Sequence, residues 1–401
     1  VKVILSHKIL LYPNNVQETY FKKASGCRRL AYNWAVEKVP QVYAVGEKTS
    51  KYDISKRFNA IKKEDYPYVL EVSKWAVQMG VQDAWTAYER FWKKISKGHP
   101  KFKKKGKSRD SFYLGGDSLK VNRRKVKIPL LSSTIRMAQE IRFPGKITSV
   151  TIGKDNNKWY ASFSVEVDET YKYPHTCENQ AVCGIDMGLT NLMIVSDGTV
   201  FSNPKYLKQH ERKLKRLQKS LSRKKKGSNR REKAKRLLSR QQEKVKNLRR
   251  DYQHKCTSGL VRKYKYLGLE TLNVKGLLKN HNLAKGIQDA GWGEIRRQFT
   301  YKTLLSGSCI ILADQFYPSS KLCSVCGKKN QNLVLGITDW VCSSCKITHD
   351  RDLNAAYNLK NLARRYRESL NTRGEDVSLE TLCSQQPLRN EKLASTVSAV
   401  V

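Results

Sequence analysis

Residues 323–356 contain Cys323-Ser-Val-Cys326, Cys342-Ser-Ser-Cys345 and His349-Asp-Arg-Asp352-Leu-Asn-Ala-Ala. Two Cys-x2-Cys pairs separated by 15 residues have the spacing at which four thiolates bind Zn²⁺ tetrahedrally. Four thiolates leave no position open for water, so we expect a structural zinc and a hydrogen-bonding role for His349. Asp352 follows seven residues after the last cysteine, so this zinc ribbon would hold a carboxylate in place.

Positive charge dominates the composition. The 401 residues include 78 Lys and Arg against 35 Asp and Glu, a formal net charge of +43. Solubility needs only roughly +2 to +8 on a small domain, so the excess predicts a polyanionic partner. Nucleic acid fits this charge better than a membrane surface or a stored polyanion. Many phosphate contacts would make such binding steeply dependent on salt.

Six further cysteines are scattered singly, which is typical of a reducing compartment and not of a disulfide framework; they are Cys27, Cys177, Cys183, Cys256, Cys309 and Cys383. The chain has no run of about 18 apolar residues that could span a membrane, and no secretion signal is visible at its start. We therefore expect a cytoplasmic protein with no membrane partner.

The first part of the chain predicts a β-barrel with a helical insertion. Residues 1–11 alternate apolar and polar side chains, and the same period-two alternation returns within 109–175, as in half-buried strands. Residues 12–108 instead show helical spacing, and one long amphipathic helix is expected over 71–95. Its aromatic and methionine side chains are expected to form a bundle core: Trp75, Met79, Trp85, Tyr88 and Trp92.

The second part predicts an α/β domain over 180–318 and 346–368, with the zinc ribbon at 319–345 inserted. Apolar stretches at Val182–Asp186, Tyr266–Glu270 and Cys309–Asp314 are expected to be strands, and the polar tail 369–401 is expected to be disordered. A basic helical hairpin is expected over 205–264. Its residues 205–250 hold 21 Lys and Arg against three acids, a density that exceeds an ordinary solvated helix face.

Two basic clusters are candidates for binding nucleic-acid phosphates. Residues 93–107 hold eight lysines and no acid, broken by Gly98, Pro100 and Gly106, which predicts a flexible basic loop. The second cluster is the turn of the basic hairpin. The backbone contacts that we expect are Lys103, Lys104, Lys105, Arg223, Lys224 and Lys225.

Three carboxylates stand where an apolar strand or a helix meets a loop: Asp186, Glu270 and Asp352. Any one of them could be a helix cap or a surface residue. Brought together, they could not all ionise without a cation, and Mg²⁺ prefers oxygen ligands from a few carboxylates. Two such ions would suit phosphodiester hydrolysis. We predict that the trio holds Mg²⁺ and is catalytic.

These motifs resemble the TnpB family, RuvC-like nucleases of bacterial and archaeal insertion sequences that are related to type V CRISPR effectors. The resemblance covers nearly the whole chain. It rests on Gly184-Ile-Asp-Met-Gly-Leu-Thr190, Leu267-Gly-Leu-Glu270, Ser319-Ser-Lys-Leu-Cys-Ser-Val-Cys-Gly327 and His349-Asp-Arg-Asp-Leu-Asn-Ala-Ala-Tyr-Asn358, with weaker signatures near Leu11-Tyr-Pro-Asn14 and Gly98-His-Pro-Lys.

The resemblance implies a multi-domain α+β fold and an RNA-guided DNA endonuclease. The barrel at 1–11 and 109–175 would be the wedge domain, 12–108 the recognition bundle, and 180–318 with 346–368 an RNase H-like (RuvC) domain. Asp186, Glu270 and Asp352 match the three catalytic acids of the family. Lys74 and Gln78, one helical turn apart, resemble its residues that read a short motif beside the target.

The same resemblance implies a guide RNA and double-stranded target DNA as partners, with one protein per guide RNA expected and a dimer left open. It also places the protein with the nucleoid of a bacterium or archaeon. Two neighbouring functions remain open. One is a type V CRISPR-like effector with a crRNA-type guide. The other is a guided DNA-binding repressor, against which the three intact acids argue. A strand-joining transposase and a plain zinc-ribbon transcription factor explain fewer of the motifs.

Overall fold

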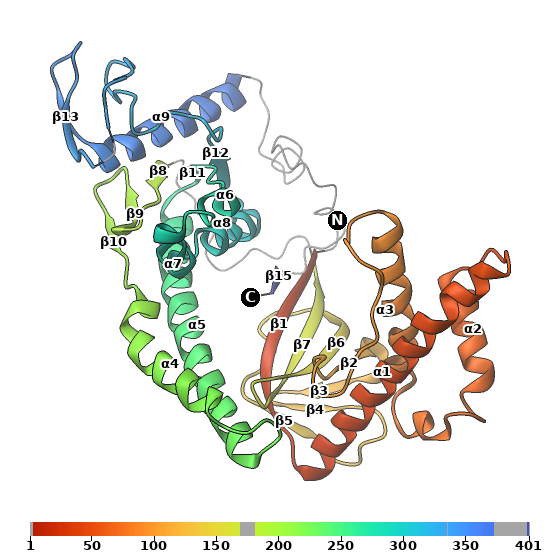
Figure 1. The fold of residues 1–401 in the computed structure, drawn as a ribbon. Coiled ribbons are helices and arrows are strands. Elements are labelled where there is room, and N and C mark those ends of the chain that lie inside the picture. Colours follow the sequence, from red (N-terminus) through yellow and green to blue (C-terminus); the bar gives the residue numbers. More distant parts are fainter. Residues whose placement is uncertain (1–2, 169–180, 335, 373–398, 401) are drawn as a thin grey trace. The chain divides into compact units, whose positions relative to one another are not determined.

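The computed structural model describes residues 3–168, 181–334, 336–372 and 399–400 (Figure 1). The chain divides into two compact units. The first comprises 1–171 together with 391–401, and the second comprises 172–390. Each unit has its own sheet and its own helices, so the protein is an α+β protein. Among the described helices, none is both long and apolar enough to cross a membrane.

The first unit contains a curled sheet whose main path is antiparallel, with β15 paired parallel to β1 off that path (Figure 1). Its path runs β2-β6-β7-β1-β5-β4-β3, and β1 pairs with β7 from Val3 opposite Val167 to Leu11 opposite Trp159. Strands β2 and β3 are the two ends of this path among the described residues. A closed barrel would need these end strands to pair, so the predicted barrel stays a prediction. The strands are β1 (Val3–Tyr12), β2 (Ser111–Gly115), β3 (Lys120–Asn122), β4 (Lys125–Lys127), β5 (Ile135–Met137), β6 (Lys146–Asp155), β7 (Lys158–Val167) and β15 (Ala399–Val400).

Helices α1 (Asn15–Ala44), α2 (Lys51–Ile61) and α3 (Lys74–Trp92), with the short 3-10 helix η1 (Pro67–Glu71), come between β1 and β2 in the chain. Helix α1 begins at a capping box in which Asn14 and Gln17 satisfy each other's backbone N–H groups. The Arg28 guanidinium binds Asp83 across α1 and α3, with Nε 2.8 Å from Oδ2. Helix α3 buries Trp85 and Tyr88 as expected, whereas Trp92 is exposed.

The second unit contains a five-stranded sheet of order β10-β9-β8-β11-β12. Strand β9 is antiparallel to both of its neighbours, β10 and β8, whereas β8, β11 and β12 are parallel. The strands and helices of the second unit are β8 (Val182–Asp186), β9 (Asn191–Val195), β10 (Val200–Ser202), α4 (Tyr206–Ser222), α5 (Asn229–Lys263), β11 (Tyr266–Leu269), α6 (Val274–Leu277), α7 (His281–Ala290), α8 (Trp292–Ser306), β12 (Cys309–Leu312), β13 (Asp339–Val341), β14 (Thr348–Asp350) and α9 (Arg351–Thr372).

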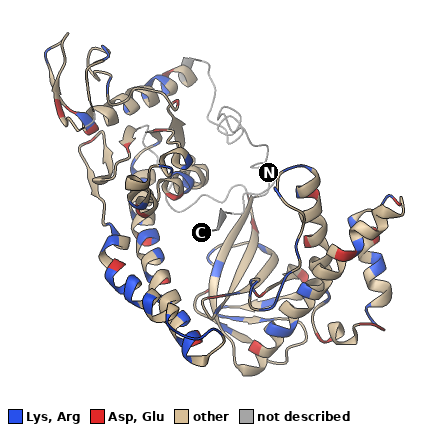
Figure 2. Ribbon diagram, in the orientation of Figure 1, with Lys and Arg blue, Asp and Glu red and all other residues tan. Residues whose placement is uncertain are grey.

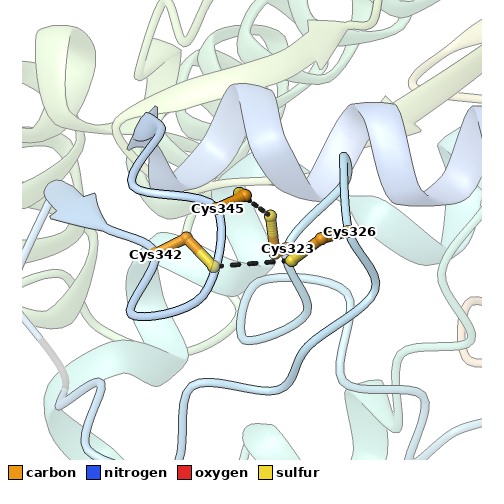
Figure 3. Close-up of side chains that lie close together, drawn as sticks. All are labelled: Cys323, Cys326, Cys342 and Cys345. Atoms are coloured by element: carbon orange, nitrogen blue, oxygen red, sulfur yellow. Dashed lines mark hydrogen bonds between the residues drawn. The ribbon is translucent and has the colours of Figure 1, made fainter.

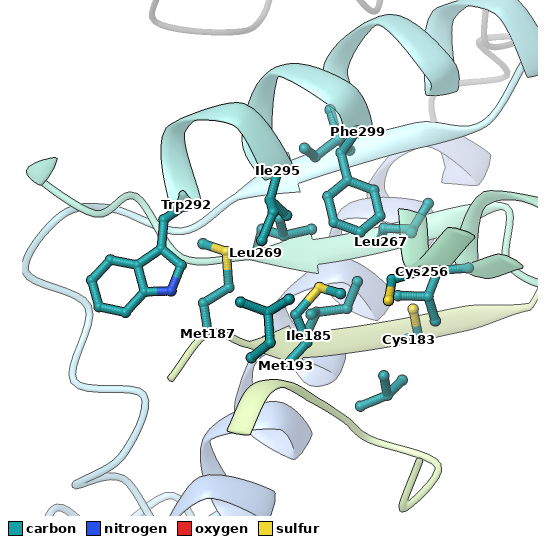
Figure 4. Packing of buried hydrophobic residues seen from close by; sticks show 14 of the residues in the cluster. Cys183, Ile185, Met187, Met193, Cys256, Leu267, Leu269, Trp292, Ile295 and Phe299 are labelled. Atoms are coloured by element: carbon teal, nitrogen blue, oxygen red, sulfur yellow. The ribbon is translucent and has the colours of Figure 1, made fainter. Parts of the chain in front are cut away.

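Helices cover both faces of this sheet. Cys183 and Ile185 of β8 and Leu267 and Leu269 of β11 point to one face and pack with residues of α5, α7 and α8, among them Phe299 (Figure 4). Tyr266 of β11 points to the other face and packs with Ala363 and Leu370 of α9. Because side chains alternate along a strand, each strand supplies both layers of the core.

Helix α9 approaches the sheet at two glycines. A Cβ added to Gly184 of β8 would overlap the carbonyl oxygen of Ala356 and the backbone of Lys360. A Cβ added to Gly268 of β11 would overlap the carbonyl oxygen of Leu359. The two glycines are direct partners in the parallel ladder. The helix backbone therefore lies directly on the sheet, which only residues without a side chain permit.

The C-terminal boundary needs one correction. The tail was expected to lose regular structure from residue 369, but α9 continues to Thr372. Leu370 is buried against Tyr266 and Ile311, so apolar packing extends the helix. Val400 belongs to the two-residue strand β15, which pairs with β1. The rest of the predicted tail, residues 373–398 and 401, lies outside the described residues.

We predict that Gly184→Ala destabilises the second unit by roughly 1–3 kcal/mol or more, because the new methyl group forces the backbone of α9 away from β8. Calorimetric unfolding measures the loss as a lower transition temperature. Gly259→Ala is the matched control: Gly259 lies within α5, and nothing lies within 4 Å of its added Cβ. Alanine there should be neutral or stabilising. Equal transition temperatures for Gly184→Ala and the unchanged protein would contradict this packing.

Candidate active site and metal centre

Strand register brings two of the predicted acids together. Gly184 and Gly268 are ladder partners, and Asp186 and Glu270 each follow their glycine by two residues. A step of two keeps the side chain on the same face. Both acids therefore reach the face covered by α9, at the carboxyl ends of neighbouring parallel strands that are about 4.8 Å apart.

Helix α9 adds the third acid. Asp352 lies in its first turn, one turn before Ala356, whose carbonyl lies over Gly184. Four helical residues rise about 6 Å and two strand residues about 6.6 Å. One turn back along α9 thus matches the step from Gly184 to Asp186, which places Asp352 over the two strand acids.

The electrostatics of the three acids agree with this arrangement. Burial, and then the charges of Glu270 and Asp352, raise the pKa of Asp186 well above its usual value. Burial also raises the pKa of Glu270, and Asp352 adds to that shift. The pKa of Asp352 is raised by burial and by Asp350. Carboxyl groups in this arrangement resist ionisation until a cation joins them.

Two residues near the acids were part of the quoted motifs but received no role from the sequence. The Ser319 hydroxyl donates a short hydrogen bond to Oε1 of Glu270. The positive charge of the Arg351 guanidinium lowers the pKa of each of the three acids and so offsets part of the upward shift. Position in a motif does not reveal such contacts, because Ser319 and Glu270 are 49 residues apart in the chain.

The donor set suits Mg²⁺, although the acids are not drawn tightly together. Among the described residues, the ligand atoms of the four cysteines all lie within 4.8 Å of one another. The carboxylate oxygens of the three acids do not form a group as tight as this. Mg²⁺ keeps several waters and substrate oxygens as ligands and needs only one or two carboxylates per ion. The raised pKa values and the oxygen donors therefore fit the predicted cation site.

The four predicted zinc ligands do converge (Figure 3). Cys323 Sγ lies 3.6 Å from Cys345 Sγ, and Cys326 Sγ lies 3.6 Å from Cys342 Sγ. A tetrahedral site with Zn–S bonds of about 2.3 Å places its sulfurs about 3.8 Å apart, whereas a disulfide needs about 2.05 Å. The cysteines are free, and their geometry fits a zinc site.

Neighbouring groups favour the thiolate at one of these cysteines, Cys342, whereas burial and the other cysteine sulfurs raise the pKa of the Cys345 thiol. Backbone N–H groups of Cys345 and Ser344 lower the pKa of the Cys342 thiol to about 6, and the thiolate is the form that binds zinc. Nε2 of the buried His349 lies 3.1 Å from Cys323 Sγ. This contact agrees with the hydrogen-bonding role expected for His349.

Lys and Arg residues occur along both helices of the hairpin formed by α4 and α5 (Figure 2). A hollow of about 690 Å³ follows α4 and is lined by six cations and one serine: Arg212, Lys215, Arg216, Lys219, Ser220, Arg223 and Lys224. Arg223 and Lys225 are exposed. This surface offers several positive charges to one extended polyanion, as the sequence predicted for the hairpin.

The other predicted nucleic-acid contacts differ in their environment. Lys74 and Gln78 are exposed on α3, and Lys104 and Lys105 are exposed in the loop that follows it. Lys103 is instead engaged within the first unit. Its Nζ lies 3.6 Å from the centre of the Tyr32 ring and 3.8 Å from Asp83 Oδ2, and burial lowers the pKa of its ammonium group.

Three family models match parts of the chain. Residues 162–281 match one described as "Probable transposase", residues 292–359 match a Cas12f1-like, TNB domain, and residues 3–48 match a helix-turn-helix domain. The second match covers the zinc ribbon and Asp352. In the structure, the third match corresponds to β1 followed by the single long helix α1.

Full-length relatives decide the family. The chain is 33% identical over 357 residues to a Streptomyces pristinaespiralis protein named "Putative RNA-guided DNA endonuclease", covering 88% of this chain and 87% of that protein. The chain belongs to the TnpB family. InsQ of Escherichia coli (strain K12), a TnpB relative with the same description, is 28% identical over 377 residues, covering 90% of this chain and 92% of its own.

A solved structure supports the fold of this TnpB chain. The protein in a cryo-EM structure of a Cas12f1–sgRNA–target DNA complex superposes with a TM-score of 0.54, over 86% of this chain and 83% of that one. Sequence identity is 14%, so the likeness concerns the fold. It agrees with the α+β class expected from the sequence.

We predict that the purified protein contains about one zinc per chain and that Cys342→Ser loses it, because three thiolates cannot complete the tetrahedral site. The second unit should then unfold at a lower temperature, since metal-binding free energy is part of its folding free energy. Elemental analysis and calorimetry measure both effects. Ser343→Ala, in the same turn, should keep the zinc. Full zinc occupancy in Cys342→Ser would rule out this ligand set.

We also predict that Asp186→Asn raises the thermal stability of the protein in a buffer without Mg²⁺ or chelator. The folded-state pKa of Asp186 is raised, so the folded protein retains the proton that the unfolded chain loses near pH 4. Stability from this group is therefore present at low pH and is lost as pH rises through the folded pKa. The transition temperature of Asp186→Asn minus that of the unchanged protein should be larger at pH 8 than at pH 5. A constant difference would refute the proposed repulsion.

Proposed function

We propose that this TnpB chain is the RNA-guided DNA endonuclease of a transposable element. It would cut double-stranded DNA beside a short adjacent motif by Mg²⁺-dependent hydrolysis. The observation that carries the proposal is the meeting of Asp186, Glu270 and Asp352 at one edge of the second unit's sheet. The names of its relatives support the activity.

The proposed chemistry is hydrolysis of one phosphodiester bond. The three carboxylates would hold the cations, which when bound activate a water and stabilise the leaving oxygen. The water oxygen bonds to phosphorus as one P–O ester bond breaks, leaving one phosphate end and one hydroxyl end. The Ser319 hydroxyl holds Glu270, and Arg351 offers a positive charge beside all three carboxylates.

The nucleic-acid partners follow from the charge and the family. We propose one guide RNA per protein and a DNA target, with the basic hairpin contacting phosphates and Lys74 and Gln78 contacting the adjacent motif. When an RNA selects the sequence, the protein needs a backbone-binding surface more than a base-reading code. The same charge favours association with the nucleoid.

The domain assignment is part of the proposal. The sheet of three antiparallel strands followed by two parallel ones supports an RNase H-like (RuvC) domain over 180–318 and 346–368, with the ribbon at 319–345 inserted. The curled sheet supports the wedge domain, and α1 to α3 support the recognition bundle at 12–108. A guided repressor would not need three mutually repelling acids, so we favour the nuclease.

We predict that Asp186→Ala abolishes DNA cleavage and leaves RNA binding unchanged, because the substitution removes a metal ligand without touching the basic surface. Cleavage of plasmid DNA and a filter-binding assay with the co-purified RNA measure the two properties. Asp251→Ala is the control, since Asp251 is an exposed acid on α5, and it should cleave normally. Wild-type cleavage by Asp186→Ala would eliminate this site assignment.

The guide can be identified by expressing the chain with its native flanking DNA, purifying it in high salt and sequencing the bound nucleic acid. We expect one RNA with a defined end and a variable segment. An RNA from the element's own end indicates a transposon guide, and a repeat-derived RNA indicates a CRISPR-type guide. A mixture of unrelated cellular RNAs would contradict guided recognition.

A further inference from the structure

Three asparagines on one face of α9 make hydrogen bonds to the first residues of the zinc ribbon. They are Asn354, Asn358 and Asn361, spaced by four and three residues, so they share a helix face. Asn354 and Asn358 are 1% and 2% exposed. Buried amides inside a helix are costly unless they find partners, and here their partners are all backbone groups of one short segment.

That segment is Ser319–Ser324, which we call the strap. Asn358 Nδ2 donates to the carbonyl oxygens of Ser319 at 2.7 Å and Leu322 at 2.6 Å. Asn354 Nδ2 donates to the Leu322 carbonyl at 2.7 Å, and its Oδ1 accepts from the N–H of Ser324 at 2.9 Å. Asn361 Nδ2 donates to the Ser324 carbonyl at 3.1 Å.

The strap connects two sites. Its far end contains the zinc ligand Cys323. Its near end is Ser319, a buried residue whose hydroxyl donates to Oε1 of Glu270. The helix that binds the strap also carries Asp352 in its first turn. One rigid element thus fixes the position of Asp352 directly and the orientation of Glu270 through the strap.

We infer that Ser319, held by the α9 asparagines, is a positioning residue that orients the Glu270 carboxylate for divalent cations. This inference deepens the proposed function, because it concerns the same site. A hydrogen bond to one carboxylate oxygen restricts rotation of the carboxylate and would leave its other oxygen available to a cation. Loss of such an outer partner typically weakens metal affinity or activity by about 10–100-fold.

The test compares Ser319→Ala with Ser320→Ala, which removes the same hydroxyl from the neighbouring position without touching Glu270. Two quantities are measured in each variant. One is the Mg²⁺ concentration that gives half-maximal cleavage. The other is the Mg²⁺ concentration that gives half of the metal-induced rise in unfolding temperature. Ser319→Ala should raise both by about tenfold, and Ser320→Ala should change neither.

Two further variants separate positioning from folding. Ser319→Thr keeps the hydroxyl and should restore the Mg²⁺ midpoints. Asn358→Asp keeps the shape but loses the donor to Ser319 and Leu322, and it should shift the midpoints in the same direction as Ser319→Ala. Zinc content should remain near one per chain in Ser319→Ala, because no zinc ligand changes.

The outcomes distinguish this inference from the proposed function. If the unchanged protein does not cleave but Ser319→Ala still weakens the Mg²⁺-induced stabilisation, positioning stands and the nuclease proposal fails. If the unchanged protein cleaves and Ser319→Ala has the same Mg²⁺ midpoints, the positioning role is overturned. It is equally overturned if Ser319→Ala and Ser320→Ala shift the midpoints alike.

Discussion

The contact between the backbone of α9 and two glycines is the constraint on which the second unit depends. Gly184 and Gly268 lie side by side in the sheet and admit the helix to backbone distance. The acids follow two residues later on the same face, where the first turn of the helix arrives. A layer of ordinary side chains at the two glycines would lift α9 and separate Asp352 from Asp186 and Glu270.

The zinc ribbon has a different structural role from that of the two glycines. It joins β12 to α9 and brings the strap against the helix, so its fold and the setting of Glu270 are linked through Ser319. The four thiols and the three acids thus differ in their expected effect on stability. Zinc bound by four thiolates would stabilise the fold, whereas three carboxyl groups with raised pKa values would oppose it until cations bind.

The sequence predicted what local pattern encodes. Periodicity predicted a strand over residues 1–11 and helices within 12–108, the cysteine spacing predicted the ribbon, and apolar strands ending in an acid pointed to Asp186 and Glu270. The sequence could not show that Gly184 and Gly268 are paired in the sheet, because the register between two strands depends on tertiary contacts. Nor could it show that Lys103 binds Tyr32 and Asp83 inside the protein, since an exposed lysine and a packed one read alike.

The glycines and the acids differ in what evolution can do with them. If Asp186 has the proposed catalytic role, its replacement would relieve repulsion, and an inactive descendant could appear without loss of stability and keep its basic surface. Replacing Gly184 or Gly268 disturbs the packing of α9 whether or not the protein cuts DNA. Descendants that have become guided binding proteins should therefore retain both glycines after the carboxylates have gone, and the glycine pair would mark their ancestry.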